Sequence, residues 1–370
     1  MAKIIKWAEK ADFCGCDFVL ELTEERKNTK IKLLQITDMQ FIDAKQARTP
    51  DRLRTDEINA WLPDNFDIHC ADQIRSLVAQ TAPDLIFITG DFIYGSFDDT
   101  GSTLDWFCNF MDSLMIPWAP VFGNHDNESA RGVEWQCARL ESSKYCVFRR
   151  GEVSGNSNYS IGIRIGGELV RVLYMLDSNG CRASTDESVI RAPGIYPDQL
   201  EAIRKNARLI KNAEGKRIPA FMAFHIPSSE FAKAEVEKGY KTKEREFYTI
   251  GVDVVGRDGD YGCKREIMHA LPPIDGFSDL IAEASVDGVF CGHCHSINTV
   301  ITHEGVKWVF GLKTGQYDYH NPGQLGGTLV CLEHDGFEVR HIPALTPLSP
   351  YPGGAKMFNG FFAEDKVILK

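Results

Sequence analysis

The chain alternates short apolar runs, typical of buried β-strands, with stretches whose apolar residues recur at helical spacing. The helical spacing is found in residues 64–82, 103–115 and 197–210. Alternation of this kind predicts an α/β protein whose helices cover the faces of a sheet, and the β-rich final third indicates a second sheet. The runs that we predict to be strands, each bounded by turn residues, are 31–37, 84–89, 117–122, 169–176, 218–224, 286–290, 306–310 and 328–332.

No repeat, low-complexity tract or convincing linker divides the chain. At 370 residues it can bury a substantial core without disulfide or metal support. We therefore expect a single domain over residues 1–346. Residues 229–275 are charged and rich in Gly and Tyr, which predicts an irregular insertion within that domain, and residues 347–370 are expected to form a C-terminal surface extension.

The charge and the apolar content exclude some classes of partner. A net charge of -11 argues against binding to a nucleic acid, which needs a surplus of Lys and Arg. No apolar run approaches the roughly 18 to 20 residues that cross a bilayer, and the first residues lack the apolar core of a secretory signal. The 11 irregularly spaced cysteines suggest reduced thiols. We therefore expect a cytoplasmic protein with no membrane partner.

Five of the predicted strands end in side chains that can bind metal ions. In open α/β sheets, ligands bind at this carboxyl edge of the strands. Carboxylates and imidazoles suit divalent Zn, Mn or Fe, and two such ions roughly 3.5 to 4 Å apart can clamp a phosphoryl group. The residues are Asp38 and Gln40 after the first strand, Asp91 and Tyr94 after the second, Asn124, His125, Asp126 and Glu128 after the third, His225 after the fifth, and His293 and His295 after the sixth.

Each of these residues alone also has an ordinary structural interpretation. Asp38 could cap a helix, Asp91 could be a turn residue, and His225 could be a buried histidine of the core. The spacing Cys291-x-x-Cys294 could indicate a redox pair. A reactive thiol typically owes its low pKa to a helix N-terminus or a nearby positive charge. The residues that follow this segment are β-like, so His293 and His295 are the better candidates for function.

The ordered set Asp38, Gly90-Asp91, Gly123-Asn124-His125-Asp126, His225 and Gly292-His293-Cys294-His295 resembles the calcineurin-like metallophosphoesterase family over about residues 31–296. The resemblance implies a four-layer α/β sandwich of two mixed β-sheets flanked by helices. It also implies a hydrolase with a binuclear metal centre, in which a metal-bound hydroxide attacks phosphorus in line. The substrate would be a small phosphorylated molecule, with a phosphomonoester favoured.

Carried onto this chain, the family pattern assigns a role to each matching residue. Asp91 would bridge the metals, with Asp38 and His295 on the first metal. The second metal would be held by Asn124, His225 and His293. His125 would face the substrate, stabilising the transition state or protonating the leaving oxygen, and Asp126 would orient His125.

The chain departs from the family at Gln40, where the common pattern Asp-x-His has a histidine. A neutral amide is a weaker ligand than imidazole, so the first metal would be held less tightly. Tyr94, three residues after Asp91, resembles the tyrosine that binds ferric iron in the purple acid phosphatase branch. The first metal is therefore Fe(III) if Tyr94 ligates; otherwise Gln40 or water completes the site with Mn, Zn or Fe(II). The alternative to an enzyme is a degenerate binding scaffold with a weakened first metal site.

Overall fold

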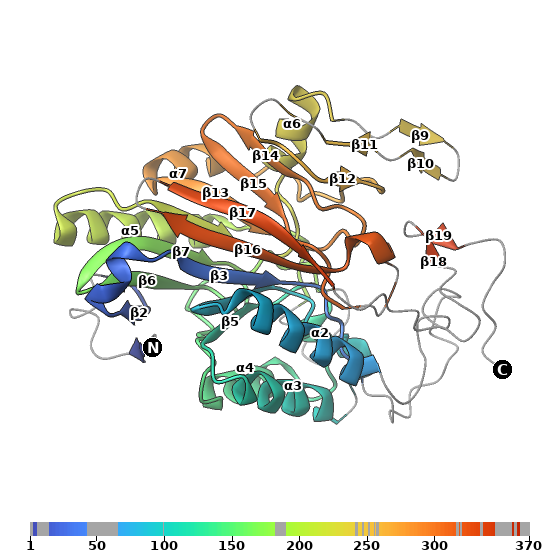
Figure 1. The fold of residues 1–370 in the computed structure, drawn as a ribbon, viewed down its shortest axis with the longest axis horizontal. Helices are drawn as coiled ribbons and strands as arrows, with labels where there is room; N and C mark the ends of the chain where they lie inside the picture. Colours follow the sequence, from blue (N-terminus) through green and yellow to red (C-terminus); the bar gives the residue numbers. More distant parts are fainter. Residues whose placement is uncertain are drawn as a thin grey trace.

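Two mixed β-sheets pack face to face in the computed structural model, and helices cover their outer faces (Figure 1). Phe87 and Phe290 meet between the sheets, with ring centroids 5.3 Å apart in a T-shaped contact. The four layers confirm the fold class predicted from the sequence. The structure describes residues 3–5, 15–42, 66–98, 100–181, 190–240, 243–245, 248–250, 252–254, 256, 259–315, 318, 320–333, 336–344, 357–358 and 361–362.

The five-stranded sheet carries three of the predicted site-bearing strands side by side. These three strands run parallel to one another and are buried along their whole length except at Lys32. Their near-continuous apolar character is typical of strands covered on both faces. Two antiparallel strands complete the sheet, whose order is β17 (Gly336–Pro343), β16 (Gly326–Glu333), β3 (Ile31–Ile36), β4 (Leu85–Thr89) and β5 (Trp118–Val121).

The eight-stranded sheet carries the other two site-bearing strands, β8 and β13, at its centre. The neighbours β7, β8, β13 and β15 are parallel, so their carboxyl ends meet at one edge. The sheet order is β1 (Lys3–Ile5), β2 (Phe18–Leu22), β6 (Tyr159–Ile165), β7 (Glu168–Met175), β8 (Ala220–Ala223), β13 (Val286–Cys291), β15 (Val306–Phe310) and β14 (Val300–His303).

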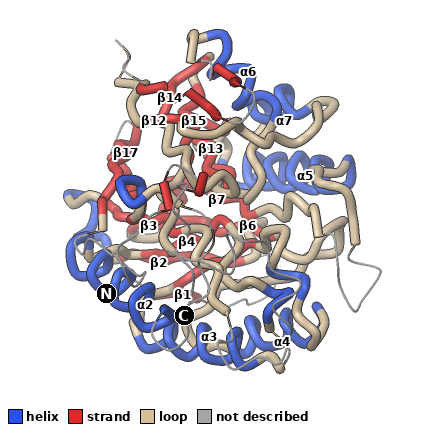
Figure 2. Tube along the Cα trace, turned by 90° about the vertical axis from the view of Figure 1, so that its right-hand side faces the viewer, coloured by secondary structure: helices blue, strands red, loops and turns tan. Residues whose placement is uncertain are grey.

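Helices form the two outer layers (Figures 1 and 2). The five-stranded sheet is covered by α2 (Phe66–Thr81), α3 (Ser102–Ser113) and α4 (Val133–Ser142). The eight-stranded sheet is covered by α5 (Pro197–Glu214), α6 (Ser229–Glu237) and α7 (Phe277–Glu283). Within the described residues, none of these helices is long and apolar enough to span a bilayer.

The region predicted as an irregular insertion is more ordered at its start than the sequence indicated. Residues 229–237 form α6, whose N-terminus is capped by the Ser228 hydroxyl accepting a hydrogen bond from the Phe231 N–H at 3.3 Å. Short antiparallel ribbons follow: β9 (Lys243–Arg245) with β10 (Tyr248–Ile250), and β11 (Val252–Asp253) with β12 (Cys263–Lys264). The predicted surface extension at 347–370 lies outside the described residues, except for β18 (Met357–Phe358) and β19 (Phe361–Phe362).

Candidate metal centre

The loops after β3, β4, β5, β8 and β13 converge where the carboxyl ends of both sheets meet. A carboxylate oxygen of Asp91 and ring nitrogens of His225 and His293 all lie within 4.8 Å of one another. These three residues are separated by up to 202 positions, since 293 minus 91 is 202. The sandwich of two sheets therefore brings together the residues that the sequence predicted as ligands of one metal.

The spacing around His225 fits a set of ligands that share a cation. Its Nε2 lies 3.1 Å from Oδ2 of Asp91, 3.2 Å from Oδ1 of Asn124 and 3.3 Å from Nδ1 of His293. Ligand atoms about 2.1 Å from one metal lie roughly 3.0 to 3.4 Å from each other, so these separations match. The residues present are compatible with a metal at this position, which we call the second position.

The tautomer of His225 also suits a ligand. Its Nδ1 lies 2.8 Å from the carbonyl oxygen of Thr89, and a carbonyl can only accept. Nδ1 therefore carries a proton, and the lone pair of neutral imidazole is on Nε2, which faces Asp91 and Asn124. A backbone carbonyl that orients a metal-binding histidine in this way is the common arrangement in metal sites.

A second group of ligand candidates lies beside the first, at what we call the first position. Nε2 of His295 lies 3.4 Å from Oδ1 of Asp38, and Nε2 of Gln40 lies 3.3 Å from the same ring nitrogen. The backbone N–H of His293 donates to Oδ2 of Asp38 at 3.1 Å and so links the two positions. Asp38 and His295 therefore meet as predicted, while the amide oxygen of Gln40 binds Lys313 instead.

Four of the predicted ligands sit on strained backbone. The φ angles are +52° at Asp38, +51° at Gln40, +49° at Asp91 and +78° at His293. Residues with a Cβ rarely adopt such angles, and they persist where the surrounding structure holds them for function. Strand ends that turn in this way aim successive side chains into the shared site rather than along the sheet.

Glycines before the ligands provide space for the site. A Cβ at Gly123 would overlap the Asp91 carboxylate, and one at Gly292 would overlap the Asp38 carboxylate and the Thr37 hydroxyl. Only Gly90, with φ of +91°, also needs the conformational freedom of glycine among these three. At Gly123 and Gly292, the close approach of these side chains is the reason that glycine is needed.

His125 lies at the side of the metal candidates and is held by two neighbours. Its ring stacks on Tyr94, with centroids 4.3 Å apart and planes at 27°. Its Nδ1 lies 2.9 Å from Oε2 of Glu128, and its backbone N–H donates to Oδ1 of Asp91 at 2.9 Å. Burial opposes protonation of the ring, yet the carboxylates of Asp91 and Glu128 raise the pKa of His125 to about 10. The ring is thus suited to carry a proton.

Asp126 has a different role from the one that we predicted. Its carboxylate accepts three backbone hydrogen bonds, from Gly123 at 2.6 Å, Asp91 at 2.8 Å and Ile93 at 3.0 Å. These bonds tie the loop after β4 to the loop after β5. Glu128, not Asp126, contacts the His125 ring, so the prediction that Asp126 orients this ring was wrong. In the short helix at Asp126–Glu128, the Asp126 carboxylate meets these backbone N–H groups while the Glu128 carboxylate meets the ring.

The buried charges of the site compensate one another. Burial disfavours ionisation, but the neighbouring His225 and His125 hold the pKa of the Asp91 carboxyl well below its usual range. Burial also opposes the charge on His225, whereas Asp91 raises the pKa of His225 to about 9. For His293, burial and the charge of His225 lower the pKa to about 3, so His293 presents a lone pair at neutral pH.

Two features near the site bear on the alternatives left open by the sequence. Burial raises the pKa of both Cys291 and Cys294 well above the ordinary value, and both thiols are free. Such thiols are unreactive, which agrees with the preference for His293 and His295 over a redox pair of cysteines. Lys313, which the sequence did not single out, is 2% exposed and contacts both Asp38 and Gln40. Burial lowers the pKa of Lys313, and the nearby carboxylates oppose this effect.

The family model of the calcineurin-like phosphoesterases matches residues 31–296. The chain belongs to this family. In this calcineurin-like phosphoesterase, the matched span contains the candidate ligands, with Asp38 near its start and His295 near its end. Lys313 lies beyond the matched span.

Similar proteins in Arabidopsis thaliana are purple acid phosphatases by description, in agreement with the tyrosine at position 94. One, described as probable inactive purple acid phosphatase 28, is 33% identical over 332 residues, covering 81% of this chain and 73% of its own. Another, probable inactive purple acid phosphatase 29, is 24% identical over 349 residues, covering 85% and 80%. A solved dimetal phosphatase from Danio rerio aligns over 85% of this chain and 96% of its own, with 11% identity and a TM-score of 0.47.

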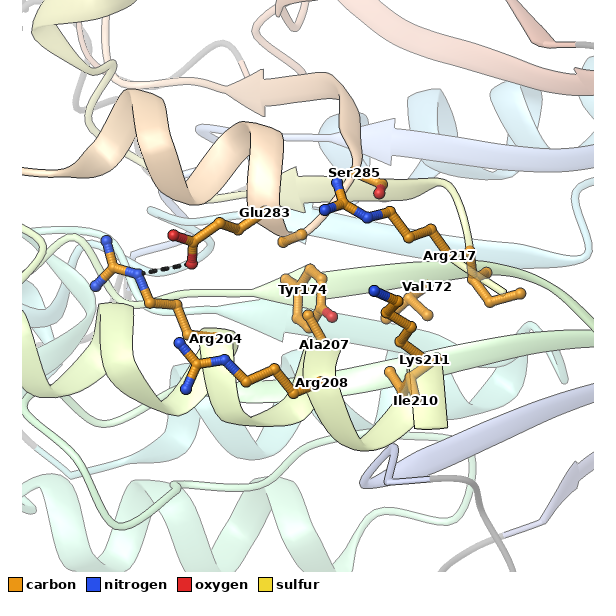
Figure 3. A pocket seen from close by; sticks show the side chains of 12 residues that line it. Val172, Tyr174, Arg204, Ala207, Arg208, Ile210, Lys211, Arg217, Glu283 and Ser285 are labelled. Carbon is orange, nitrogen blue, oxygen red and sulfur yellow. Dashed lines mark hydrogen bonds and ion pairs between the residues drawn. The ribbon is translucent and has the colours of Figure 1, made fainter. Parts of the chain in front are cut away.

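A pocket of 220 Å³ lies at the opposite end of the eight-stranded sheet, between α5 and α7 (Figure 3). Ile218 and Ser285, which line it, precede β8 and β13, whereas the candidate ligands follow these strands. Its basic side chains include Arg204, which donates to Glu283 at 3.1 Å, and the neighbouring Arg208. The pocket is therefore separate from the candidate metal centre.

Proposed function

We propose that the chain is a phosphoester hydrolase that works with two metal ions and acts on a small phosphomonoester. The convergence of Asp91, Asn124, His225 and His293, with ligand atoms at metal-site spacing, is the observation that carries this proposal. When bound, the metal ions would supply positive charge to the phosphoryl oxygens and lower the pKa of a water molecule. Asp38 and His295 would hold the first ion, and Asp91 would lie between the two.

His125 is the group that we assign to the leaving oxygen. In the metal-free site Asp91 and Glu128 raise its pKa to about 10, and Glu128, which holds no metal, still favours a proton on the ring when Asp91 binds the ions. Glu128 binds Nδ1 of the ring, so Nε2 on the other side of the ring is available to the substrate. The stacked Tyr94 ring limits rotation of the imidazole. Both contacts keep the proton at a fixed atom, which is what general acid catalysis requires.

The identity of the metals depends on Tyr94. A phenolate ligand would favour Fe(III) at the first position, whereas water there would suit Mn, Zn or Fe(II). Gln40 is disfavoured as the remaining ligand because Lys313 binds its amide oxygen. Elemental analysis with a visible spectrum separates the two ligand sets: a coloured protein that loses its colour on Tyr94→Phe supports ligation, and a colourless iron-loaded protein contradicts it.

A binding scaffold without catalysis is the second candidate function. Two similar proteins are described as probable inactive phosphatases, and the chain has Gln40 where the family pattern has histidine. Against this, His125 and its partner Glu128 are in place. A scaffold would bind a phosphorylated ligand without converting it, so binding of inorganic phosphate together with absent turnover would favour this candidate.

We also propose a reducing, cytoplasmic environment. The ten cysteines among the described residues form no disulfide, and nine of them are buried while Cys263 is partly buried. Chains that mature in oxidising compartments tend to pair their cysteines. Thiol counting on the unfolded protein isolated under alkylating conditions tests this point, since a paired cysteine would escape labelling.

The proposed activity is tested with an aryl phosphate and protein supplied with Mn, Zn or Fe. Asn124→Ala and His225→Ala should abolish metal-dependent phosphate release. The matched control is His303→Ala, because His303 pairs with Glu237 at 2.8 Å on β14, outside the site. Turnover that persists in both ligand variants would refute the proposal, as would the absence of turnover on every mono- and diester with each metal.

A further inference from the structure

A buried lysine lies beside the first metal position. The ammonium of Lys313 donates to the backbone oxygen of Asp38 at 2.7 Å and to Oε1 of Gln40 at 2.8 Å. Lysine has donors and no acceptor, so the atom of Gln40 that faces it must be the amide oxygen. This contact fixes the orientation of an amide group whose two ends are otherwise hard to distinguish.

The orientation of Gln40 decides what it offers to a cation. With its oxygen bound to Lys313, its Nε2 faces Nε2 of His295 at 3.3 Å. An amide nitrogen donates, whereas a metal ligand must present a lone pair. Gln40 therefore presents no ligand atom to the first position, and its N–H group competes with a metal for the lone pair of His295.

Lys313 is held in place through its backbone. The N–H of Thr314 donates to the carbonyl of Thr37 at 2.8 Å, and the Thr314 hydroxyl accepts from the Thr37 N–H at 3.1 Å. Gly315 packs so tightly on Met39 that a Cβ there would overlap the Met39 backbone. The loop after β15 is thus fastened to the loop after β3, and this places the Lys313 ammonium beside Asp38.

The two metal positions differ in the groups that surround them. At the second position, Nε2 of His225 faces oxygen and nitrogen lone pairs of three neighbours at 3.1 to 3.3 Å. At the first position, a fixed positive charge accompanies Asp38. Two cations in a buried site repel each other much more strongly than in water, because the local dielectric constant is low.

We propose that Lys313 is a positioning residue that makes the two metal positions unequal, by turning the Gln40 oxygen away from the first position and placing a fixed positive charge beside it. The second position retains its metal, while the first binds weakly and exchanges with free metal in solution. The inference rests on the proposed function only for the existence of two positions. Occupancy of the first position then becomes a means of regulation by the supply of free metal.

Metal binding by the full chain tests the inference without any substrate. The protein is stripped with a chelator, and Mn²⁺ or Zn²⁺ is titrated in by calorimetry, with elemental analysis after desalting. The wild type should retain about one equivalent, and its second equivalent should bind at least about tenfold more weakly, as is common when the surroundings of a ligand are unfavourable. Lys313→Met should tighten the weak equivalent by about tenfold and leave the tight one unchanged.

Three further variants make the test specific. Lys313→Arg keeps the charge and a donor and should behave as the wild type. Gln40→His supplies an imidazole and should tighten the weak equivalent, which covers the case in which Lys313→Met fails to fold. Lys307→Met is the matched control, because Lys307 is half-buried over the Phe337 ring, outside the site. It should leave both equivalents unchanged, and melting temperatures confirm that each variant is folded.

Two results would overturn the inference. One is a wild type that retains two equivalents of equal affinity, and the other is an unchanged weak equivalent in both Lys313→Met and Gln40→His. These outcomes are distinct from failure of the proposed function. Two metal equivalents of unequal affinity in a protein that hydrolyses no phosphoester would support the inference and refute the proposed function. Two equivalents of equal affinity in an active enzyme would refute the inference and support the proposed function.

Discussion

Oε2 of Glu128 lies 2.9 Å from Nδ1 of His125 and fixes the one histidine of the site that has no role as a metal ligand. Glu128→Gln removes the charge that helps to raise the pKa of this ring. The alkaline limb of the pH–rate profile should therefore move to lower pH, with the loss of turnover increasing as the pH approaches about 10. Steady-state kinetics from pH 5 to 10 provide the measurement, and a profile identical to that of the wild type would exclude the proposed proton donor.

Asp126 should matter for stability rather than for the proton donor. Asp126→Asn weakens three buried hydrogen bonds to the N–H groups of Gly123, Asp91 and Ile93. We expect a loss of about 2 kcal/mol in the free energy of unfolding, the usual cost of leaving a buried N–H group without its acceptor. Chemical denaturation measures the loss. The pH dependence of any remaining activity should be unchanged, and a shifted profile with unchanged stability would restore the orienting role first predicted for Asp126.

Space at Gly123 should be essential for the metal centre. A Cβ in Gly123→Ala overlaps the Asp91 carboxylate, so the variant should lose metal while the distant parts of the fold remain intact. Gly194→Ala is a suitable control, because among the residues that the structure describes only the Tyr196 ring lies near its Cβ, at an ordinary 3.7 Å. Metal content after desalting separates the two variants. Full metal retention by Gly123→Ala would show that the carboxylate is not fixed where the structure has it.

Protons and metal should compete at His225. Burial opposes its charge, but Asp91 raises its pKa to about 9 in the metal-free site. Metal must displace this proton, so affinity should rise with pH up to about 9. Calorimetry at pH 7 in two buffers of different ionisation enthalpy should reveal proton release. That release should be absent in His225→Gln, and proton-independent binding by the wild type would contradict the assignment of this ligand.

The same pKa shift has a consequence for the metal-free protein. Since the folded-state pKa of His225 is raised, its stabilising contribution is complete below the ordinary value of about 6.5 and is lost as pH rises through about 9. The metal-free protein should therefore melt at a lower temperature at pH 9.5 than at pH 7. Added Zn²⁺ should remove most of the difference. Thermal scans of both forms test this, and identical pH dependence with and without metal would be inconsistent with it.

The strands and the ligand-bearing strand ends were predictable from the sequence because both are local patterns. An apolar run followed by Asp91 or His225 needs no knowledge of its partners. Strands β6 and β17 were missed for different reasons. Most of β6 is buried, but Ser160, Gly162 and Arg164 interrupt its apolar residues, whereas most of β17 is partly exposed. The order of strands within the sheets also depends on long-range packing, which the local pattern does not contain.

The contacts between site residues were less predictable. Sequence proximity favoured Asp126 as the partner of His125, whereas the turn brings Glu128 to the ring. Lys313 follows β15 and lies in none of the motifs, and only the fastening of its loop to Thr37 brings it to Gln40. The sequence shows that Gln40 stands where the family pattern has histidine, but it does not show that Lys313 binds Gln40.

The central claim is that Asp91, Asn124, His225 and His293 hold a metal ion that is needed for phosphoester hydrolysis. The most direct measurement is phosphate release from an aryl phosphate by stripped protein as one metal is added back, with bound metal counted in the same samples. Activity should appear only as metal binds, and Asn124→Ala should abolish both metal binding and activity. Metal-independent release, or full metal binding and turnover in Asn124→Ala, would contradict it.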